Sequence, residues 1–317
     1  MIPFRGDHPY PQRMHAPSSR SPSRSPLRIA ISFGIVTLIW GSTWIVIKTQ
    51  LGVVPASWSV TWRFLLAGLV MAGVCLATGK PLRLDRQGHL FALAIGVMQF
   101  SLNFNLVYRA EEHLASGLVA LTFALLIIPN AVLSSVFFGT RITPRFAFGS
   151  ALGIAGLMLV FARDLLAPGA NGGEIGLGLA LAVAAVLCAG IANVMQASRT
   201  GRAQPLEPGL AFAMAYGTII NGAFAWAMAG PPVFDPSPGY IAGIAYLGIV
   251  ASAVAFSLYY TLIREIGAGK AAYTSVIVPL VAMGLSTAFE GYRWSALAVA
   301  GAVLALAGLV VALRSRD

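Results

Sequence analysis

Long apolar segments separated by short polar ones run through most of this 317-residue chain. Ten of the apolar segments have about the 20 residues that a helix needs to cross the hydrocarbon core of a bilayer. They lack the strict alternation of apolar and polar positions that marks the strands of a membrane barrel, so we expect helices. The predicted spans are 28–50, 56–78, 88–109, 114–138, 144–162, 174–198, 207–229, 238–263, 269–289 and 294–313. The pattern predicts an all-α polytopic membrane protein.

Composition strengthens this prediction. Hydrophobic residues make up 57% of the chain and charged residues only 10%, whereas a water-soluble domain carries about 25% charged residues. The net charge of +10 could suit a nucleic-acid binder, but basic cytoplasmic loops of a membrane protein explain it better. We therefore expect a lipid bilayer around the chain and no nucleic-acid partner.

Residues 1–27 differ from the rest, because they are rich in Pro, Ser and Arg and poor in aliphatic residues. Such a composition cannot form a packed core and predicts a disordered basic tail. A cleavable signal peptide is not expected, since the next apolar segment is long enough to span and many more follow it.

The basic residues predict the orientation. If the N-terminus is cytoplasmic and the spans alternate, sixteen of the 21 Lys and Arg residues fall on the cytoplasmic side and only Arg109, Arg163 and Arg293 fall outside. Lys48 and Arg63 lie inside spans. This asymmetry is what the positive-inside rule describes. It predicts two cytoplasmic termini and a location in the plasma membrane, which for a bacterium is the inner membrane.

The chain contains an internal repeat. A shift of 152 residues places the third to fifth spans on the eighth to tenth. The matched pairs include Gly96 and Gly248, Phe104 and Phe256, Tyr108 and Tyr260, Gly117 and Gly269, Thr122 and Thr274, Gly139 and Gly291, and Arg141 and Arg293. Each half (28–163 and 174–314) has five spans, an odd number, so the second half enters the membrane inverted. Inverted repeats are typical of carriers with a substrate site near the midplane between the halves.

Several short motifs resemble those of EamA-type transporters in the drug/metabolite transporter superfamily. They are Trp-Gly-Ser-Thr-Trp at 40–44 with Lys48, Pro55, Trp-Arg-Phe at 62–64, Ala-Ser-Gly at 115–117 and Gly-Ala-Gly at 267–269. The resemblance covers roughly 30–314 and implies ten helices, two inverted five-helix repeats, and export or exchange of amino acids, related metabolites or drugs. The family often has an acidic residue late in the fourth span. This chain has Phe138 there and retains the acid only in the second half, as Glu290.

One charged residue is the strongest single candidate for substrate contact. Arg63 lies about one-third into the second span, where a charge costs at least ~2.5 kcal/mol. It is expected to face the bundle interior, either as a structural bridge or as a contact for an anionic substrate group. Trp40, Trp44 and Lys48 share one helix face at i, i+4 and i+8. For Trp40 and Trp44 packing is the alternative to lining a cavity, and for Lys48 the alternative is extension to the outer interface.

Other polar and aromatic positions complete the predicted cavity lining. Simple interhelical hydrogen bonding is the alternative for each amide. The full set predicted to contact substrate is Trp40, Thr43, Trp44, Arg63, Gln99, Asn103, Tyr108, Thr122, Asn193, Gln196, Ser252, Phe256, Tyr259 and Thr274.

Pro and Gly residues predict where helices bend and pack. Pro129 and Pro279 lie mid-span in corresponding helices, where proline removes a backbone donor and bends or opens the helix. Two rows of small residues, 149–156 and 301–308, allow close helix packing. We expect that packing within each repeat rather than between two chains, and a monomer or a homodimer.

The sequence does not suggest catalysis. The four His residues lie in the tail or at loops, no Asp or Glu lies at mid-membrane depth, and the two Cys residues have no metal-binding spacing. We therefore expect no metal, no cofactor and no enzyme, and favour facilitated diffusion or exchange over proton antiport. The predicted function is a carrier that exports or exchanges small metabolites such as amino acids. The main alternative is a multidrug or other metabolite carrier coupled to protons; a nucleotide-sugar carrier, a channel, a scaffold or receptor, and an intramembrane enzyme are weaker.

Overall fold

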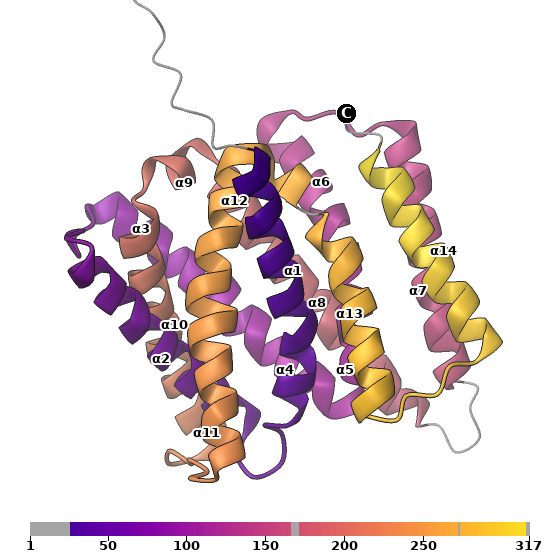
Figure 1. Ribbon diagram of the computed structural model, residues 1–317, viewed down its shortest axis with the longest axis horizontal. Helices are drawn as coiled ribbons and strands as arrows, with labels where there is room; N and C mark the ends of the chain where they lie inside the picture. The colour runs from indigo at the N-terminus through magenta and orange to yellow at the C-terminus, as the bar shows by residue number, and fades with distance from the viewer. Residues whose placement is uncertain (1–25, 166–170, 272, 315–317) are drawn as a thin grey trace, which may run out of the picture.

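A computed structural model describes residues 26–165, 171–271 and 273–314, and all regular elements in these ranges are helical (Figure 1). The predicted basic tail, residues 1–27, lies outside the described residues except for its last two positions. The all-helical prediction is confirmed for the described part of the chain.

The elements occur in the order α1 (Pro26–Lys48), α2 (Ala56–Ala77), α3 (Arg86–Ile95), η1 (Gly96–Asn103), α4 (Phe104–His113), α5 (Ser116–Phe123), η2 (Ala124–Leu126), α6 (Ile127–Phe138), α7 (Pro144–Leu165), α8 (Gly172–Ala197), α9 (Arg199–Ala203), α10 (Leu206–Ala229), α11 (Pro238–Ala245), η3 (Tyr246–Val254), α12 (Ala255–Ala271), α13 (Thr274–Phe289) and α14 (Ala296–Leu313). Within the described ranges, eight helical segments are long and apolar enough to cross a membrane. The helices at 274–289 and 296–312 are apolar but shorter.

Three predicted spans are helices of mixed type. Residues 86–113 run through α3, η1 and α4, residues 116–138 through α5, η2 and α6, and residues 238–271 through α11, η3 and α12. The ninth span is predicted to start at 269; α12 is assigned to Ala271 and α13 begins at Thr274, but the helical backbone of α12 is broken at Gly267, just before the predicted start. Gly267, with φ 84°, interrupts the regular backbone here, a conformation that favours glycine.

The two π-helical segments η1 and η3 occupy corresponding positions. The 152-residue shift that matches the halves places residues 96–103 on 248–255, and η3 covers Tyr246–Val254. The same shift pairs Gly139 with Gly291, and both have φ 68° near a helix end: Gly139 directly follows α6, and Gly291 follows the last residue of α13 by two. π-helical turns are rare and occur frequently at functional sites. The interior of the bundle next to η1 and η3 is therefore a candidate for the functional site.

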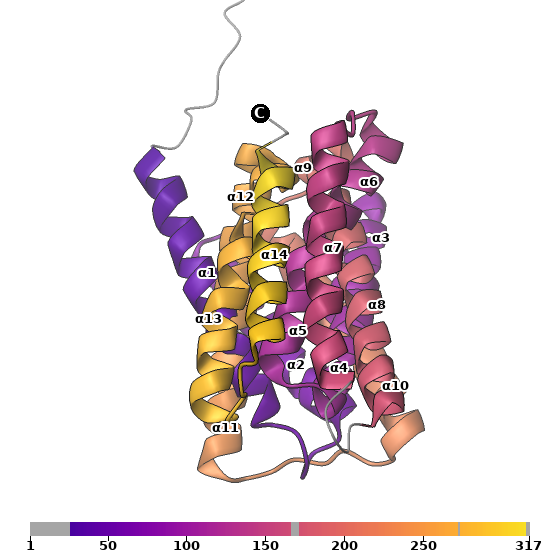
Figure 2. The ribbon, with the colours of Figure 1, turned by 90° about the vertical axis from the view of Figure 1, so that its right-hand side faces the viewer.

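The last helix of each half packs against the other. α7 and α14 lie at one edge of the bundle in Figure 1 and side by side in Figure 2. Gly156 faces Gly301 while Gly149 faces Gly308, so the two helices run antiparallel. A Cβ atom built on Gly301 would lie 2.7 Å from the carbonyl oxygen of Gly156. The expectation that these small residues pack within each repeat is therefore wrong: they join α7 to α14, because only glycine lets the two backbones approach this closely.

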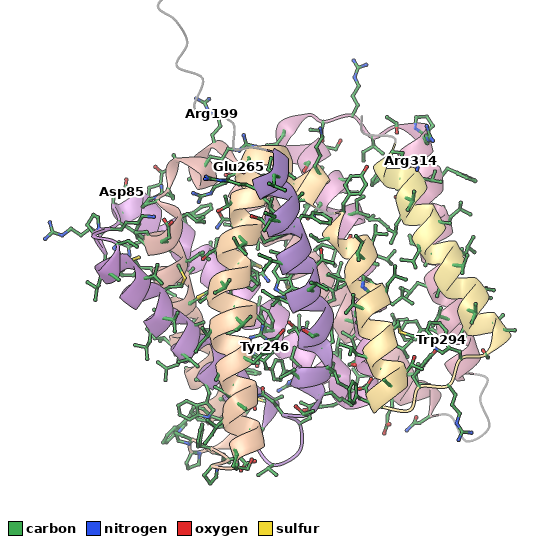
Figure 3. The ribbon with its side chains drawn as sticks, in the orientation of Figure 1. Asp85, Arg199, Tyr246, Glu265, Trp294 and Arg314 are labelled. Atoms are coloured by element: carbon green, nitrogen blue, oxygen red, sulfur yellow. The ribbon has the colours of Figure 1, made fainter. Side chains whose placement is uncertain are left out.

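The two ends of the bundle differ in the residues they carry. The start of α1 and the end of α14 lie at the same end of the bundle (Figure 1). Asp85, Arg199, Glu265 and Arg314 lie toward that end, whereas Trp294 lies toward the opposite one (Figure 3). Between the two ends, α1 packs on α12 and α13 and α2 packs on α10, which encloses the interior.

Candidate functional site

A cavity of about 90 Å³ lies in the interior of the bundle. Its wall is formed by residues of α1, α2, η1, α4, α5 and η2 from the first half of the chain and of α8, α12 and α13 from the second. The cavity therefore lies where the two halves meet. Its lining residues are Trp40, Thr43, Trp44, Ile47, Arg63, Gln99, Asn103, Phe104, Val107, Ala120, Phe123, Leu126, Ala189, Asn193, Phe256, Tyr259, Thr274, Ser275, Val278 and Pro279. The wall is mostly apolar and aromatic with a few polar groups, as ligand sites commonly are.

Arg63 is the charged residue of the cavity wall. It is 0% exposed, its Nε donates to Ser252 Oγ over 3.0 Å, and its guanidinium carbon lies 4.2 Å from the centre of the Phe104 ring. The Nη1 and Nη2 atoms make no hydrogen bond of good geometry to a described residue, although the Tyr108 side chain lies beside the guanidinium. One edge of the guanidinium is thus fixed, and two donors are available for a ligand.

Aromatic rings form a second part of the wall. The Trp40 ring lies 4.7 Å from Tyr259 and 5.2 Å from Phe256, and its Nε1 donates to the backbone oxygen of Ala251 over 3.2 Å. Trp44 lies 5.0 Å from Phe123. These contacts hold the rings in fixed, tilted arrangements, so the wall offers rigid apolar surface to a ligand.

Two further buried polar atoms at the cavity lack partners in the described structure, Trp44 Nε1 and Asn103 Oδ1. Trp44 is 8% exposed and Asn103 is 2% exposed. Buried polar groups in proteins are nearly always hydrogen-bonded, and an exception calls for a specific explanation. With the two Arg63 donors, the cavity therefore presents three N–H bearing atoms and one oxygen acceptor that a bound polar molecule would satisfy.

Most of the residues predicted to contact substrate meet at this cavity. Those in its lining are Trp40, Thr43, Trp44, Arg63, Gln99, Asn103, Asn193, Phe256, Tyr259 and Thr274, and Pro279 joins them. The fold explains why these residues meet. Gln99 and Asn103 both belong to η1, and Trp40 and Trp44 lie one turn apart on α1.

Two predicted residues lie directly behind Arg63 instead. Ser252, in η3, is fully buried and accepts the Arg63 Nε hydrogen bond. Tyr108 is also fully buried beside Arg63, but its hydroxyl donates to Gln50 Oε1 over 3.1 Å. Both residues position the guanidinium rather than face the cavity.

Three other predicted residues lie elsewhere. Gln196 accepts from Arg264 Nη2 over 3.3 Å near α9, away from the cavity wall. Thr122 donates to the backbone oxygen of Leu118 in its own helix over 3.0 Å. Pro129 follows the 3₁₀ turn η2, where the helix changes type, and packs against Gly190 of α8. By contrast, α13 continues through Pro279 without a change of helix type.

Lys48 follows neither predicted alternative. Its ammonium donates to the backbone oxygen of Glu111 and, over 3.0 Å, to that of Leu114. The last carbonyls of a helix have no intrahelical partner, and a cation at this end is favourable. Lys48 therefore joins the end of α1 to the end of α4.

Two acidic residues lie near this lysine, and one of them, Glu111, is more deeply placed than the sequence indicated. Glu290, at the end of α13, accepts from the Ser116 backbone nitrogen and hydroxyl and from Ser286 Oγ. Glu111 lies in the last turn of α4, as expected, but is 0% exposed. The position of Glu111 near the end of a predicted span did not indicate that other helices bury its side chain.

Sequence reasoning missed several lining residues, most of them aliphatic or aromatic: Ile47, Phe104, Val107, Ala120, Phe123, Leu126, Ala189, Ser275 and Val278. Ile47 lies three residues after Trp44, and Phe104 and Val107 follow Asn103 by one and four. This helical spacing was the available signal for Ile47 and Val107, and the match of Phe104 to Phe256 under the 152-residue shift was the signal for Phe104. For the others, an apolar residue in an apolar helix carries no mark of which side faces the cavity.

The profile of the EamA-like transporter family matches residues 28–162 and 176–314.

The described residues contain no cluster of three or more His, Cys, Asp or Glu that could hold a metal ion.

Several curated proteins are similar to most of the chain. Protein PagO of Salmonella typhimurium is 24% identical over 84% of this chain and 86% of its own. The uncharacterized inner membrane transporter YedA of Escherichia coli K12 is 26% identical over 83% of this chain and 84% of its own. A probable amino-acid metabolite efflux pump of the same strain is 25% identical over 87% and 92%. A crystal structure with 19% identity superposes with a TM-score of 0.66 over 91% of this chain and 98% of that chain, which shows a shared fold.

Proposed function

Because this chain belongs to the EamA-like transporter family, we propose that it is an alternating-access carrier that exports or exchanges small zwitterionic metabolites, with amino acids as the leading class. As a family member it is a multi-pass membrane transporter. The substrate class and the mechanism are our proposal.

The unsatisfied polar atoms of the cavity carry the proposal. A zwitterion presents a carboxylate that accepts hydrogen bonds and an ammonium that donates them. Arg63 offers Nη1 and Nη2 as paired donors, and Asn103 offers Oδ1 as an acceptor. A guanidinium edge binds a carboxylate through two parallel hydrogen bonds, which fixes its orientation as well as its charge. The aromatic wall from Trp40 to Phe256 then suits an apolar side chain.

We further propose ten transmembrane helices arranged as two inverted repeats, 28–163 and 174–314, with substrate bound between them. The matching positions of η1 and η3, the two helix-ending glycines at 139 and 291, and the antiparallel packing of α7 on α14 support this arrangement.

Both termini are proposed to be cytoplasmic, with the chain in the bacterial inner membrane. Support comes from the basic residues, which concentrate in segments assigned to one side, and from YedA, which is described as an inner membrane transporter. The probable amino-acid metabolite efflux pump of E. coli supports the substrate class by similarity.

Counterflow in proteoliposomes tests the proposal. Vesicles are loaded with an unlabelled pool of amino acids and diluted into the same pool carrying label at trace level. A carrier gives saturable entry of label that the internal pool stimulates. We expect Arg63→Ala to abolish this entry, since losing one partner of a buried charge pair costs 2–5 kcal/mol, roughly 30- to several-thousand-fold in affinity. Arg63→Lys should retain part of it, because lysine keeps the charge but not the paired donors.

Arg109→Ala is the matched control. Arg109 lies on α4 over the Phe224 ring, 5.4 Å from its centre, and does not line the cavity. It should transport as the unsubstituted protein does. Label entry that the internal pool does not stimulate would contradict the carrier mechanism with amino acids, and equal loss in both arginine variants would contradict the role of Arg63.

A multidrug carrier is the second candidate, favoured by the aromatic wall formed by Trp40, Trp44, Phe123, Phe256 and Tyr259. Such a wall accepts flat apolar molecules without a carboxylate. If lipophilic cations compete for the site and amino acids do not, this candidate replaces the first. Their transport would then survive Arg63→Ala.

A further inference from the structure

Lys48 joins two spans at one end of the bundle through backbone carbonyls. It is the last residue of α1, and its ammonium donates to the backbone oxygens of Glu111 and Leu114. Glu111 lies in the last turn of α4, and Leu114 is the residue that caps that helix. Carbonyls at the C-terminal end of a helix lack partners within it and attract a cation. Lys48 therefore holds the first span to the end of the third.

Arg264 makes the same kind of contact at the opposite end. The next residue, Glu265, lies toward the end of the bundle where α1 begins (Figure 3). The Arg264 guanidinium donates to the backbone oxygens of Gly201 over 2.9 Å and Gln204 over 3.0 Å. Gln204 caps the C-terminal end of α9, and Gly201 precedes it by three residues, which is the acceptor spacing at the end of α4. Arg264 Nη2 also donates to Gln196 Oε1 of α8 over 3.3 Å.

The short helix α9 belongs with α8, so Arg264 holds α8 to α12. Ser198 is the one residue between the two helices, and its Oγ accepts from the backbone nitrogen of Gly201 over 3.1 Å. A Cβ atom at position 201 would collide with the backbone oxygen of Met195 in α8. The chain thus folds back tightly at this point, and α9 follows any movement of the end of α8.

The two contacts join corresponding pairs of spans. α1 and α4 belong to the first and third spans of the first half, and α8 and α12 belong to the first and third spans of the second half. The 152-residue shift places Glu112, the neighbour of one Lys48 acceptor, on Arg264. In the inverted arrangement that we propose, corresponding pairs lie at opposite sides of the membrane. The same contact is therefore present once at each end.

Both contacts lie just beyond the cavity. The nearest lining residues on the joined helices are Ile47 of α1, Val107 of α4, Asn193 of α8 and Tyr259 of α12. Lys48 directly follows the first of these, and Arg264 follows the last by five residues. Tyr260 and Ile263, which lie between the cavity and Arg264 on α12, are fully buried. Buried side chains therefore separate the cavity from the end of the bundle where Arg264 lies.

The opposite end is closed in the same way. On α4, Tyr108 and Glu111 follow the cavity-lining Val107 and are fully buried, and Leu114 is 4% exposed. A substrate can leave the cavity at either end only if the helices joined there separate.

The two cations are placed so that their contacts can break. The side chains of Lys48 and Arg264 are both partly exposed. When the joined helices separate, water replaces the carbonyl acceptors, so no charge is left buried without a partner. Contacts of this kind can form and break repeatedly, as a carrier requires at each end of its path.

From this geometry, and resting on the proposed carrier mechanism, we infer that Lys48 and Arg264 are two latches that close opposite ends of the substrate path. A latch here is a side chain whose hydrogen bonds hold two helices together while its end of the path is shut. Arg264 closes the proposed cytoplasmic end and Lys48 the outer end. Each latch opens while the other is closed, so loss of one cation shifts the population toward the state that is open at its end.

Single-cysteine reporters in the cavity test the latches without any substrate. Ala189 of α8 and Ala120 of α5 line the cavity, and each is replaced by Cys in a protein that lacks Cys75 and Cys188. A small charged thiol reagent that does not cross the membrane is added to inside-out vesicles for the cytoplasmic face and to spheroplasts for the outer face. The labelling rate reports how often the cavity opens to each face.

Arg264→Gln should raise labelling from the cytoplasmic face about tenfold or more, without a rise from the outer face. Lys48→Gln should do the reverse. A tenfold change corresponds to the loss of one hydrogen bond from a charged group. Arg202→Gln is the matched control, because Arg202 is exposed on α9, and it should leave both rates unchanged. Unchanged rates in the latch variants, or a rise at both faces in one of them, overturn the inference.

A milder variant decides if a latch variant does not give a single folded species in gel filtration. Gln196→Met removes one acceptor of Arg264 and leaves the charge and the backbone contacts in place. It should raise labelling from the cytoplasmic face alone, by less than Arg264→Gln. Unchanged labelling in Gln196→Met then overturns the inference.

The outcomes separate the latches from the proposed substrate. Counterflow that depends on Arg63, with labelling that neither latch variant changes, keeps the carrier and rejects the latches. Opposite changes in labelling in the two latch variants, without counterflow of any amino acid, keep the latches and reject the substrate class.

Discussion

The Nε atom of Arg63, a residue of the cavity wall, donates to Ser252 Oγ across 3.0 Å, which joins α2 to the π-helical segment η3. The hydrogen bond fixes one edge of the guanidinium, so Ser252 acts on the substrate through the orientation of Arg63. This relationship connects the two halves of the chain at the proposed substrate site.

We predict that Ser252→Ala lowers the apparent affinity for the amino-acid pool about 3- to 10-fold, which corresponds to loss of one hydrogen bond. The maximal rate of counterflow should change less than the affinity. Ser257→Ala is the control, because Ser257 Oγ bonds to the backbone oxygen of Ala253 in its own helix over 2.6 Å. An unchanged affinity in Ser252→Ala would show that Phe104 and Tyr108 orient Arg63 without this hydrogen bond.

Asn103 should discriminate substrates by their ammonium group. Its Oδ1 is the unsatisfied acceptor of the cavity, and a site built to bond a polar group rejects analogues that lack it. Carboxylic acids that match the amino acids but lack the amine should therefore compete poorly with label entry. Asn103→Leu should narrow this difference by about tenfold or more. If the difference persists in Asn103→Leu, another group binds the ammonium.

Lys48 should contribute to stability through the end of α4. Lys48→Met removes donors to the backbone oxygens of Glu111 and Leu114, and we expect a loss of about 2 kcal/mol because hydrogen bonds from charged groups contribute about that much. Lys80→Met is the control. The Lys80 side chain is 45% exposed and pairs with Glu207 at 2.5 Å, and exposed pairs contribute about 1 kcal/mol or less. Thermal unfolding in detergent measures both; equal shifts would contradict the prediction.

Gly301→Ala should destabilise the packing of α7 on α14. The added Cβ would lie 2.7 Å from Gly156 O and 2.8 Å from Val160 Cγ2, so the helices must separate, at a cost of about 1–3 kcal/mol. Gly284→Ala is matched in helix type and meets nothing within 4 Å. It should be neutral or more stable by up to about 1 kcal/mol. Thermal unfolding of both variants measures the difference, and similar melting would mean that the interface adapts without loss.

Arg199 and Trp294 lie toward opposite ends of the bundle (Figure 3), so they should lie on opposite sides of the membrane. The test uses a protein with Cys75 and Cys188 replaced and a maleimide that does not cross the inner membrane. Trp294→Cys should react in intact spheroplasts. Arg199→Cys should react only after the inner membrane is permeabilised. The reverse pattern would invert the proposed orientation, and reaction of both in intact spheroplasts would contradict the proposed topology.

Hydropathy predicts where most helices begin and end in the described part of the chain. The expected spans 28–50 and 174–198 correspond to α1 at Pro26–Lys48 and α8 at Gly172–Ala197. It does not predict helix type. The π segments η1 and η3 depend on how side chains pack between helices, and nothing in the apolar pattern of 96–103 or 246–254 differs from an ordinary helix.

The polar part of the cavity could be predicted because each polar group in a membrane interior needs a reason to be there. Arg63, Asn103 and Asn193 were found in this way, and all three line the cavity. Burial of Glu111 could not be predicted, since a residue near a span end faces either water or protein according to the neighbouring helices. The prediction that the two glycine rows pack within each repeat is wrong for the same reason. The sequence shows that one face of a helix carries small residues, but it does not show which helix packs against that face.

The glycine contact between α7 and α14 has a consequence for how the molecule is made. α7 packs extensively with α14 and only slightly with other elements, and about 150 residues of chain separate the two glycine rows, 149–156 and 301–308. During synthesis α7 enters the bilayer before α14 has been made. The glycine face of α7 therefore contacts lipid until α14 is inserted. The seam along α7 is closed by α14, which follows all the cavity-lining elements in the chain. A chain that stops before α14 therefore contains every cavity-lining residue but leaves the glycine face of α7 uncovered.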